Sequence, residues 1–313
     1  MFRTCRRAAL VLTVAVSLHA APAGAAPGQV EHRSYTNAAG TRAYNLYVPT
    51  SGGAGKPLMI WLHGCGLPGD MTAGHALSRV AEEMGFSIAF PLQTSADNPG
   101  SCWNWFDSAS MHRGGGEASI IAGITTSLIG ELGSDADRVY VGGYSAGGAM
   151  TSVMGAAYPD LYAAIAPSAG APYGIYDVSG QSASTEMGPR ARPLPAWIIQ
   201  GVTDELSNYV VGRANILQWL GTDDYADDGA SNQSVARYPS SVTPVVPSAD
   251  LPVPLLVEHY KQGSCELAQF VTSPAEHLLN GALLYYDQGI GLQRQMMAFL
   301  LAHRKGAPRQ ACG

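Results

Sequence analysis

Residues 139–150, VYVGGYSAGGAM, place one serine between two pairs of glycines at the end of a short apolar run. Small residues on both sides of a polar one are typical of a backbone that turns tightly or passes close to another segment. The run RVYVGG (138–143) predicts a strand, and residues 146–157 have the spacing of a helix. The pattern therefore predicts a sharp strand-to-helix turn that presents Ser145.

Strand and helix patterns alternate along most of the chain on both sides of this turn. Short, continuous apolar runs are typical of buried parallel strands, and segments with helical spacing separate them. Near the start, VEHRSY and RAYNLYV flank NAAG and predict an antiparallel hairpin. The alternation predicts an α/β fold with helices on both faces of a mostly parallel, doubly wound sheet, and ligands bind such folds beyond the carboxyl ends of the strands. The expected core strands are 57–63, 86–91, 138–143, 162–168, 195–201 and 266–272, and the expected helices are 73–84, 117–132, 146–157, 208–220 and 291–303.

Residues 221–254 interrupt this alternation and predict a surface excursion or lid before the last strand. Four aspartates near its start could bind calcium, but they lack a loop pattern that would specify this ion. We therefore favour a solvated acidic loop, and we expect no metal site. Residues 27–313 as a whole are expected to form a single domain. The four aspartates are Asp223, Asp224, Asp227 and Asp228.

The 313 residues are 46% hydrophobic, which is enough for a buried core. Residues 1–26 predict a secretory signal peptide, because basic residues precede a short apolar run and small residues that suit cleavage follow it. No later stretch approaches the length of a membrane helix. The mature protein is expected to be soluble and extracellular, or periplasmic where an outer membrane retains it.

Loss of the signal peptide changes the formal net charge from −6 to −9 and leaves three lysines in the chain. Such a chain lacks the basic surface that nucleic acids and anionic membranes attract, so neither is an expected partner. Four cysteines remain, and an even number in an oxidising compartment indicates disulfides, since their spacing does not resemble a zinc site. Three pairings are possible, and we favour Cys65–Cys102 and Cys265–Cys312.

A serine hydroxyl is a weak nucleophile until a base removes its proton, so Ser145 needs a histidine and an orienting acid. A nucleophile elbow of the strand–turn–helix type carries these residues in the order serine, acid, histidine. Asp204 lies just past the expected strand 195–201 and is the predicted acid. Its neighbour Glu205 is the competitor, one residue deeper in the loop.

The predicted base is His277, which follows the expected strand 266–272. Two other histidines are rivals. His259 precedes that strand and is expected at the opposite edge of the sheet. His303 lies at the end of the last expected helix, where capping of the helix C-terminus explains its presence.

Acyl transfer also needs two N–H donors for the developing oxyanion. The Ala146 N–H at the start of a helix is one candidate. The Cys65 N–H in LHGCG is the other, because the glycines on both sides let this loop double back. His63 is then a structural residue that fixes the loop, and a Cys65–Cys102 bridge would tie the loop to CWNWF and bring two tryptophans near the cleft. The predicted substrate-binding residues are Trp103, Trp105 and Tyr144.

With these residues assembled, the chain resembles the extracellular polyhydroxybutyrate depolymerase family of esterases and the related feruloyl and acetylxylan esterases. The resemblance covers about residues 30–303 and rests on LHGCG, CWNWF, VYVGGYSAGGAMT, AAYPDLYAAIAPSAGAPYG and IIQGVTDE, in the order found in the family. It implies an α/β-hydrolase fold and the Cys65–Cys102 bridge. It also implies Ser145 as nucleophile, Asp204 as acid, His277 as base, and the Cys65 and Ala146 amides as the oxyanion hole.

Two departures from the family concern the substrate. Members usually continue from the catalytic histidine into a Trp- and Gly-rich turn, whereas this chain continues with EHLLNGALLYY. Depolymerases of solid polymer commonly carry a linker and a binding domain, and neither follows before Gly313. A soluble ester, an oligomer or an amorphous polymer surface is therefore expected rather than a crystalline granule.

The expected activity is cofactor-free hydrolysis of carboxylic esters, and the favoured substrate is a short-chain polyhydroxyalkanoate, poly(3-hydroxybutyrate), or its oligomers. The alternatives are a feruloyl or acetylxylan esterase, an exported acyltransferase with the same triad, and a binding protein on an inactive hydrolase scaffold. A peptidase is less expected, because no gating domain accompanies the core.

Overall fold

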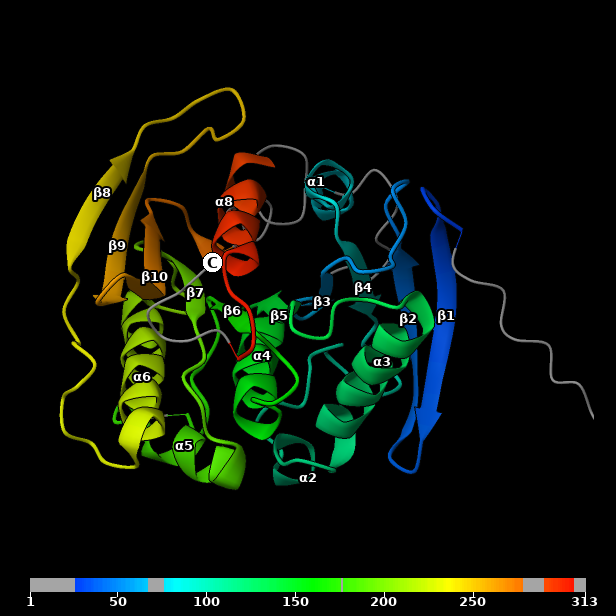
Figure 1. Ribbon diagram of the computed structural model, residues 1–313, viewed down its shortest axis with the longest axis horizontal. Helices are drawn as coiled ribbons and strands as arrows, with labels where there is room; N and C mark the ends of the chain where they lie inside the picture. The colour runs from blue at the N-terminus through cyan, green and yellow to red at the C-terminus, as the bar shows by residue number, and fades with distance from the viewer. Residues whose placement is uncertain (1–25, 67–75, 176, 278–289, 307–313) are drawn as a thin grey trace, which may run out of the picture.

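The fold is built on one sheet of ten strands, which runs across the centre of the molecule (Figure 1). The structure, a computed structural model, describes residues 26–66, 76–175, 177–277 and 290–306. The strand order in the sheet is β1-β2-β4-β3-β5-β6-β7-β10-β9-β8. The strands are β1 (Val30–Asn37), β2 (Gly40–Tyr47), β3 (Leu58–Leu62), β4 (Ser87–Pro91), β5 (Val139–Tyr144), β6 (Ala164–Ser168), β7 (Ala196–Gly201), β8 (Ser241–Val245), β9 (Leu255–Gln262) and β10 (Cys265–Ser273).

The middle of the sheet is parallel and both of its sides are antiparallel. Six strands, from β4 to β10 in sheet order, pair in parallel, and each was expected from its continuous apolar run. β1 and β2 form the predicted antiparallel hairpin, which joins the sheet along β4. The predicted mostly parallel sheet with an N-terminal antiparallel hairpin is confirmed.

Helices cover both faces of the sheet (Figure 1). One apolar cluster joins the sheet to α3, α4, α5 and α6, and a second cluster joins the opposite face to α1 and α8. The two clusters bury the apolar side chains of the central strands on both faces, which is why these strands lack alternating polarity. The helices are α1 (Ala76–Met84), α2 (Ser108–Met111), α3 (Gly116–Leu132), α4 (Ala146–Ala157), α5 (Gln181–Met187), η1 (Gly188–Arg190), α6 (Tyr209–Asp228) and α8 (Ile290–Leu301).

The segment 221–254 agrees with the predicted surface excursion only in part, because residues 229–254 are mostly exposed but the segment also contains regular structure. Its first eight residues continue α6, which ends at the left-handed Gly229, and Ser241–Val245 forms the edge strand β8. β9 was not predicted, because it lacks a continuous apolar run. It pairs with β8 and with β10, in both cases antiparallel. The segment therefore extends the sheet at its C-terminal side.

The prediction of a solvated acidic loop is also wrong for two of the four aspartates, since Asp223 and Asp224 are buried on α6. Asp223 accepts a hydrogen bond from the Leu194 N–H at 2.7 Å. Asp224 accepts bonds from the N–H groups of Gln233 and Val235 and from the Ser234 hydroxyl. Burial alone would raise the pKa of the Asp224 carboxyl, but these bonds hold it below its usual value. The carboxylates thus anchor the chain before β7 and the chain after α6.

One of the two favoured disulfides lies within the described residues. Cys65 and Cys102 are joined, with 4.2 Å between their Cα atoms. Cys265 is disulfide-bonded as well, but Cys312 lies outside the described residues, so its pairing stays a prediction. Among the described helices, none is long and apolar enough to cross a membrane.

Candidate active site

The turn between β5 and α4 has the geometry that the sequence predicts. Ser145 has φ 57° and ψ −122°, a strained conformation for a residue with a side chain. A Cβ on Gly143 would lie 2.5 Å from the Gly147 carbonyl oxygen, and a Cβ on Gly147 would overlap the carbonyl oxygen of Leu62. Glycines are therefore required on both sides of Ser145, because strand and helix cross here with no room for side chains.

Three predicted residues from distant parts of the chain meet at this turn. His277 Nε2 lies 3.0 Å from Ser145 Oγ, and His277 Nδ1 lies 2.6 Å from Asp204 Oδ2. Asp204 follows β7 and His277 follows β10, so the parallel pairing of these strands brings both loops to the same edge of the sheet. The Asp204 side chain is 0% exposed and the His277 side chain 11% exposed. The arrangement can pass a proton from the serine hydroxyl to the imidazole.

The Asp204 carboxylate is held by its own loop. Its Oδ1 accepts hydrogen bonds from the N–H groups of Leu206 and Ser207 at 2.9 and 2.7 Å, and the Gln200 amide reaches Oδ2 at 3.3 Å. With these bonds in place, Oδ2 is directed at the Nδ1–H of His277, which leaves Nε2 free to accept from Ser145. The rival acid, Glu205, is exposed.

The rival histidines have other partners. His259 lies on β9 and bonds to Glu266 Oε1 at 2.5 Å and to Thr243 Oγ1 at 3.1 Å. His303 is buried just past α8, where its Nδ1 bonds to the Phe299 carbonyl at 2.8 Å. The predicted capping role of His303 is therefore confirmed.

Tyr144 supports His277 and does not face a substrate. Its side chain is 1% exposed, its hydroxyl donates to the His277 carbonyl at 2.8 Å, and the two rings lie 5.0 Å apart. The predicted substrate contact of Tyr144 is therefore wrong. No sequence signal distinguishes a buried tyrosine before the nucleophile from an exposed one.

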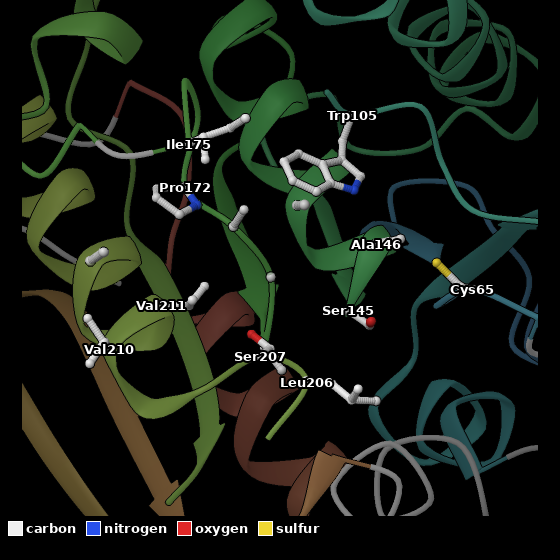
Figure 2. A pocket seen from close by; sticks show the side chains of 15 residues that line it. Cys65, Trp105, Ser145, Ala146, Pro172, Ile175, Leu206, Ser207, Val210 and Val211 are labelled. Atoms are coloured by element: carbon white, nitrogen blue, oxygen red, sulfur yellow. The ribbon is translucent and has the colours of Figure 1, made fainter. Parts of the chain in front are cut away.

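The residues that carry the two predicted oxyanion donors, Cys65 and Ala146, both lie beside Ser145 (Figure 2). Ala146 is the first residue of α4, where N–H groups have no acceptor within the helix. Cys65 follows β3 and is fixed by its disulfide to Cys102. Beneath this loop, His63 is buried, pairs its Nδ1 with the Gly64 carbonyl at 2.7 Å and accepts from the Gln93 N–H at 2.8 Å. The predicted structural role of His63 is confirmed.

A buried carboxylate that sequence reasoning missed holds the segment after Cys102. Glu117, in the first turn of α3, accepts from the backbone and side-chain N–H groups of Asn104 at 2.7 and 2.8 Å, and from the Gln93 amide at 2.6 Å. Gln93 also donates to the Cys102 carbonyl at 3.0 Å. An acidic residue in the first turn of an apolar helix, after three glycines, was the available signal.

Ser145 lies at the wall of an apolar pocket of about 390 Å³ (Figure 2). Trp105 lines it, as predicted, but Trp103 does not. Trp103 is 0% exposed and packs against His63 and Arg42, so its predicted substrate contact is wrong. The described lining residues are Cys65, Trp105, Ser145, Ala146, Ala149, Ala169, Gly170, Ala171, Pro172, Ile175, Leu206, Ser207, Val210, Val211 and Ala214, and none of them is charged.

Within the described ranges, no group of three or more His, Cys, Asp or Glu side chains is placed to hold a metal ion. What the site offers chemically is a hydroxyl, an imidazole, a carboxylate and two backbone donors beside an apolar pocket.

Comparison with known proteins identifies relatives of the chain. Poly(3-hydroxyalkanoate) depolymerase C of Paucimonas lemoignei is 35% identical over 204 residues, which are 64% of this chain and 49% of that protein. Probable acetylxylan esterase A of Aspergillus fumigatus is 31% identical over 199 residues, 58% of this chain and 53% of that protein. The chain thus spans about half the length of these relatives.

The acetyl xylan esterase from Aspergillus awamori has a similar solved structure, with a TM-score of 0.63 over 87% of this chain and 100% of that one, at 22% identity. This likeness confirms the predicted α/β-hydrolase fold. The family described as Esterase PHB depolymerase matches residues 42–220, which include Ser145, Asp204 and both oxyanion candidates. Because this match covers more than half of the chain, the chain belongs to the esterase PHB depolymerase family.

Proposed function

We propose that the protein hydrolyses carboxylic esters, with Ser145 as the nucleophile, His277 as the general base and Asp204 as the acid that orients the imidazole. The observation that carries this proposal is the continuous pair of hydrogen bonds from Asp204 through His277 to Ser145 at the strained turn before α4. Family membership and the names of the relatives support the same activity.

The reaction is a two-step acyl transfer. Ser145 Oγ attacks the ester carbonyl carbon while its proton passes to His277 Nε2, and the Asp204 carboxylate stabilises the imidazolium that forms. The N–H groups of Cys65 and Ala146 stabilise the negative charge on the carbonyl oxygen. His277 then protonates the leaving alcohol. The same imidazole finally takes a proton from water, whose oxygen attacks the acyl-enzyme, and the acid leaves as Ser145 recovers its proton. These steps require neither a metal nor an organic cofactor.

As substrate we propose a short-chain polyhydroxyalkanoate, poly(3-hydroxybutyrate) or its oligomers. The apolar pocket, with no charged residue among its described lining, suits an uncharged aliphatic acyl chain. The relative from Paucimonas lemoignei is named for this polymer class. The alternative is an acetyl or feruloyl ester of a plant polysaccharide, which the similarity to an acetylxylan esterase favours.

We also propose that the protein is exported. The Cys65–Cys102 bridge and the disulfide-bonded state of Cys265 support an oxidising compartment. Residues 1–25 of the predicted signal peptide lie outside the described residues.

The test is release of acid by the purified protein from amorphous poly(3-hydroxybutyrate), a soluble butyrate aryl ester and acetylated xylan. Ser145→Ala should abolish release from every substrate that the native protein cleaves, because a triad nucleophile contributes on the order of 10⁴-fold or more to kcat. Ser127→Ala, an equal truncation at an exposed site on α3, is the matched control and should keep full activity. Release of acid from acetylated xylan but not from poly(3-hydroxybutyrate) would favour the alternative substrate. Activity of Ser145→Ala equal to that of the native protein would refute the mechanism.

A further inference from the structure

A buried carboxylate that the proposed mechanism does not use holds segments that line the site. Glu117 is 5% exposed, and its oxygens accept hydrogen bonds from Asn104 and Gln93 at 2.6 to 2.8 Å. Its negative charge is stabilised by the first turn of α3 and by Arg42, whose Nη2 lies 3.4 Å from Oε1. Burial of a carboxylate costs free energy unless it is paired and hydrogen-bonded, and a fully bonded buried network fixes the segments that it joins.

One branch of this network leads to the wall of the pocket. Asn104 donates its backbone N–H to Glu117 Oε2 and its side-chain N–H to Oε1, so the backbone and the side chain of this residue are both held. Trp105 follows directly in the chain and lines the pocket beside Ser145 (Figure 2). Because consecutive Cα atoms are only about 3.8 Å apart, a fixed Asn104 also restricts the position of Trp105.

The other branch leads to a proposed oxyanion donor. The side-chain amide of Gln93 donates one hydrogen bond to Glu117 and another to the Cys102 carbonyl at 3.0 Å. Cys102 carries the disulfide to Cys65. The backbone N–H of Gln93 donates to His63, two residues before Cys65. Gln93 therefore holds the Cys65 loop at two points, and Glu117 orients the Gln93 side chain.

Both branches end on parts of the site where small displacements matter. Removal of one oxyanion donor lowers kcat on the order of 10²- to 10³-fold, and a misplacement of about 1 Å can cost about 100-fold. A support of the Cys65 N–H should therefore affect the rate, and a support of Trp105 should affect the fit of the acyl chain. Glu117 supports both, although it is not among the described residues that line the pocket.

We propose that Glu117 is a positioning residue that acts on two parts of the site at once. Through Gln93 it places the Cys65 N–H at the oxyanion. Through Asn104 it places Trp105 against the acyl chain. This inference rests on the proposed esterase activity and deepens it. Glu117 does not touch the ester, so its substitution should misplace these two groups without removing any reacting group.

The test uses Glu117→Gln, which keeps the size of the side chain but replaces one acceptor oxygen by an N–H donor. For a butyrate aryl ester, kcat should fall about tenfold. The second readout is the affinity for an alkyl trifluoromethyl ketone. Ser145 Oγ adds to its carbonyl carbon, the proton passes to His277, and the carbonyl oxygen becomes the oxyanion. Because this adduct uses the same N–H donors as the transition state, its affinity should fall by a similar factor.

Gln93→Met separates the two branches, since it removes the amide but keeps the backbone N–H and a side chain of similar size. The kcat and the ketone affinity should fall as in Glu117→Gln, because the support of Cys65 is lost. The ratio of kcat/KM for the hexanoate and acetate aryl esters should stay native in Gln93→Met. In Glu117→Gln this ratio should fall about threefold, because the longer chain depends on contact with Trp105.

Asp224→Asn is the matched control. Asp224 is also a buried carboxylate that accepts bonds from N–H and hydroxyl groups, but it lies about 21 Å along α6 from Val210 of the pocket. This variant should lose stability, as Glu117→Gln does, and keep native kcat, ester selectivity and ketone affinity. Equal losses of ketone affinity in Asp224→Asn and Glu117→Gln would overturn the inference, because general destabilisation would explain them.

Native kcat and ketone affinity in folded Glu117→Gln would also overturn the inference and leave the esterase proposal intact. Where Glu117→Gln does not fold, Gln93→Met decides in the same way, since native values of both readouts in that variant overturn the inference. Absence of any Ser145-dependent hydrolysis by the native protein would instead overturn the esterase proposal and this inference with it.

Discussion

The position of His277 depends on the residue that precedes the nucleophile. The Tyr144 hydroxyl donates to the His277 carbonyl, and its ring lies against the imidazole. Tyr144→Phe keeps the ring and removes this bond, which is worth about 1 kcal/mol. We expect kcat to fall roughly fivefold with little change in KM, since the imidazole is misplaced but the pocket is untouched.

The matched control is Tyr47→Phe, which also removes one hydroxyl bond, to Glu82 at 2.7 Å, but at a site without a contact to the triad. Its kcat on the butyrate aryl ester should equal that of the native protein. Equal kcat values for both variants and the native protein would mean that the Tyr144 bond does not position His277.

Also at the residue scale, the sequence predicts the positions of some side chains of the site but not of others. Ser145, Asp204 and His277 could be placed because each follows a recognisable strand, and parallel strands bring their carboxyl ends to one edge. Trp103 and Tyr144 were assigned to the substrate, yet both are buried. Sequence gives the identity of an aromatic ring but not the direction in which it points, because that direction depends on packing between segments distant in the chain.

At the level of elements, the close crossing of β5, α4 and the loop after β3 decides the shape of the elbow. Gly147→Ala would favour an isolated helix by propensity, but here the added Cβ would overlap the Leu62 carbonyl oxygen. We expect the free energy of unfolding to fall by about 1–3 kcal/mol, as for overpacked sites. Denaturant unfolding with the disulfides intact measures this change.

Gly130→Ala provides the matched control, since Gly130 lies on an exposed part of α3 with open space around its Cβ position. This change should raise the free energy of unfolding by about 0.5–1 kcal/mol. If both variants shifted stability in the same direction and by the same amount, steric exclusion at the elbow would not be the reason for Gly147.

Elements at the C-terminal side of the sheet were the hardest to predict. β8 contains a proline and is mostly exposed, and β9 carries charged and polar residues among its apolar ones, so neither has the continuous apolar run of a buried strand. The end of α6 resembled an acidic loop, but Asp223 and Asp224 are satisfied by N–H groups from other segments. Hydrogen-bond partners that lie far away in the chain cannot be predicted from the local sequence.

At the scale of the whole molecule, the sheet separates two apolar clusters, and the site lies beyond the carboxyl ends of the parallel strands β5, β7 and β10. The alternation of buried strands and helices was sufficient to predict this layered arrangement, because each parallel strand must be covered on both faces. Buried His63 packs beneath the loop after β3 and bonds to the Gly64 carbonyl, so it contributes to the packing of the fold and to the position of the loop that carries Cys65.

His63 also makes the stability of this part of the molecule depend on pH. Burial lowers the pKa of His63, and its Nε2 accepts from the Gln93 N–H, which requires a neutral ring. Below about pH 6.5 the unfolded chain binds a proton at this histidine that the folded chain does not, so the free energy of unfolding falls as pH decreases toward the folded pKa, by up to about 1.4 kcal/mol per pH unit. His63→Asn, which cannot titrate, should be less stable at pH 7 but lose less stability than the native protein between pH 7 and 5. Denaturant midpoints at both pH values measure the difference, in which all other titrating groups cancel, and identical losses in the two proteins would show that His63 is not the group responsible.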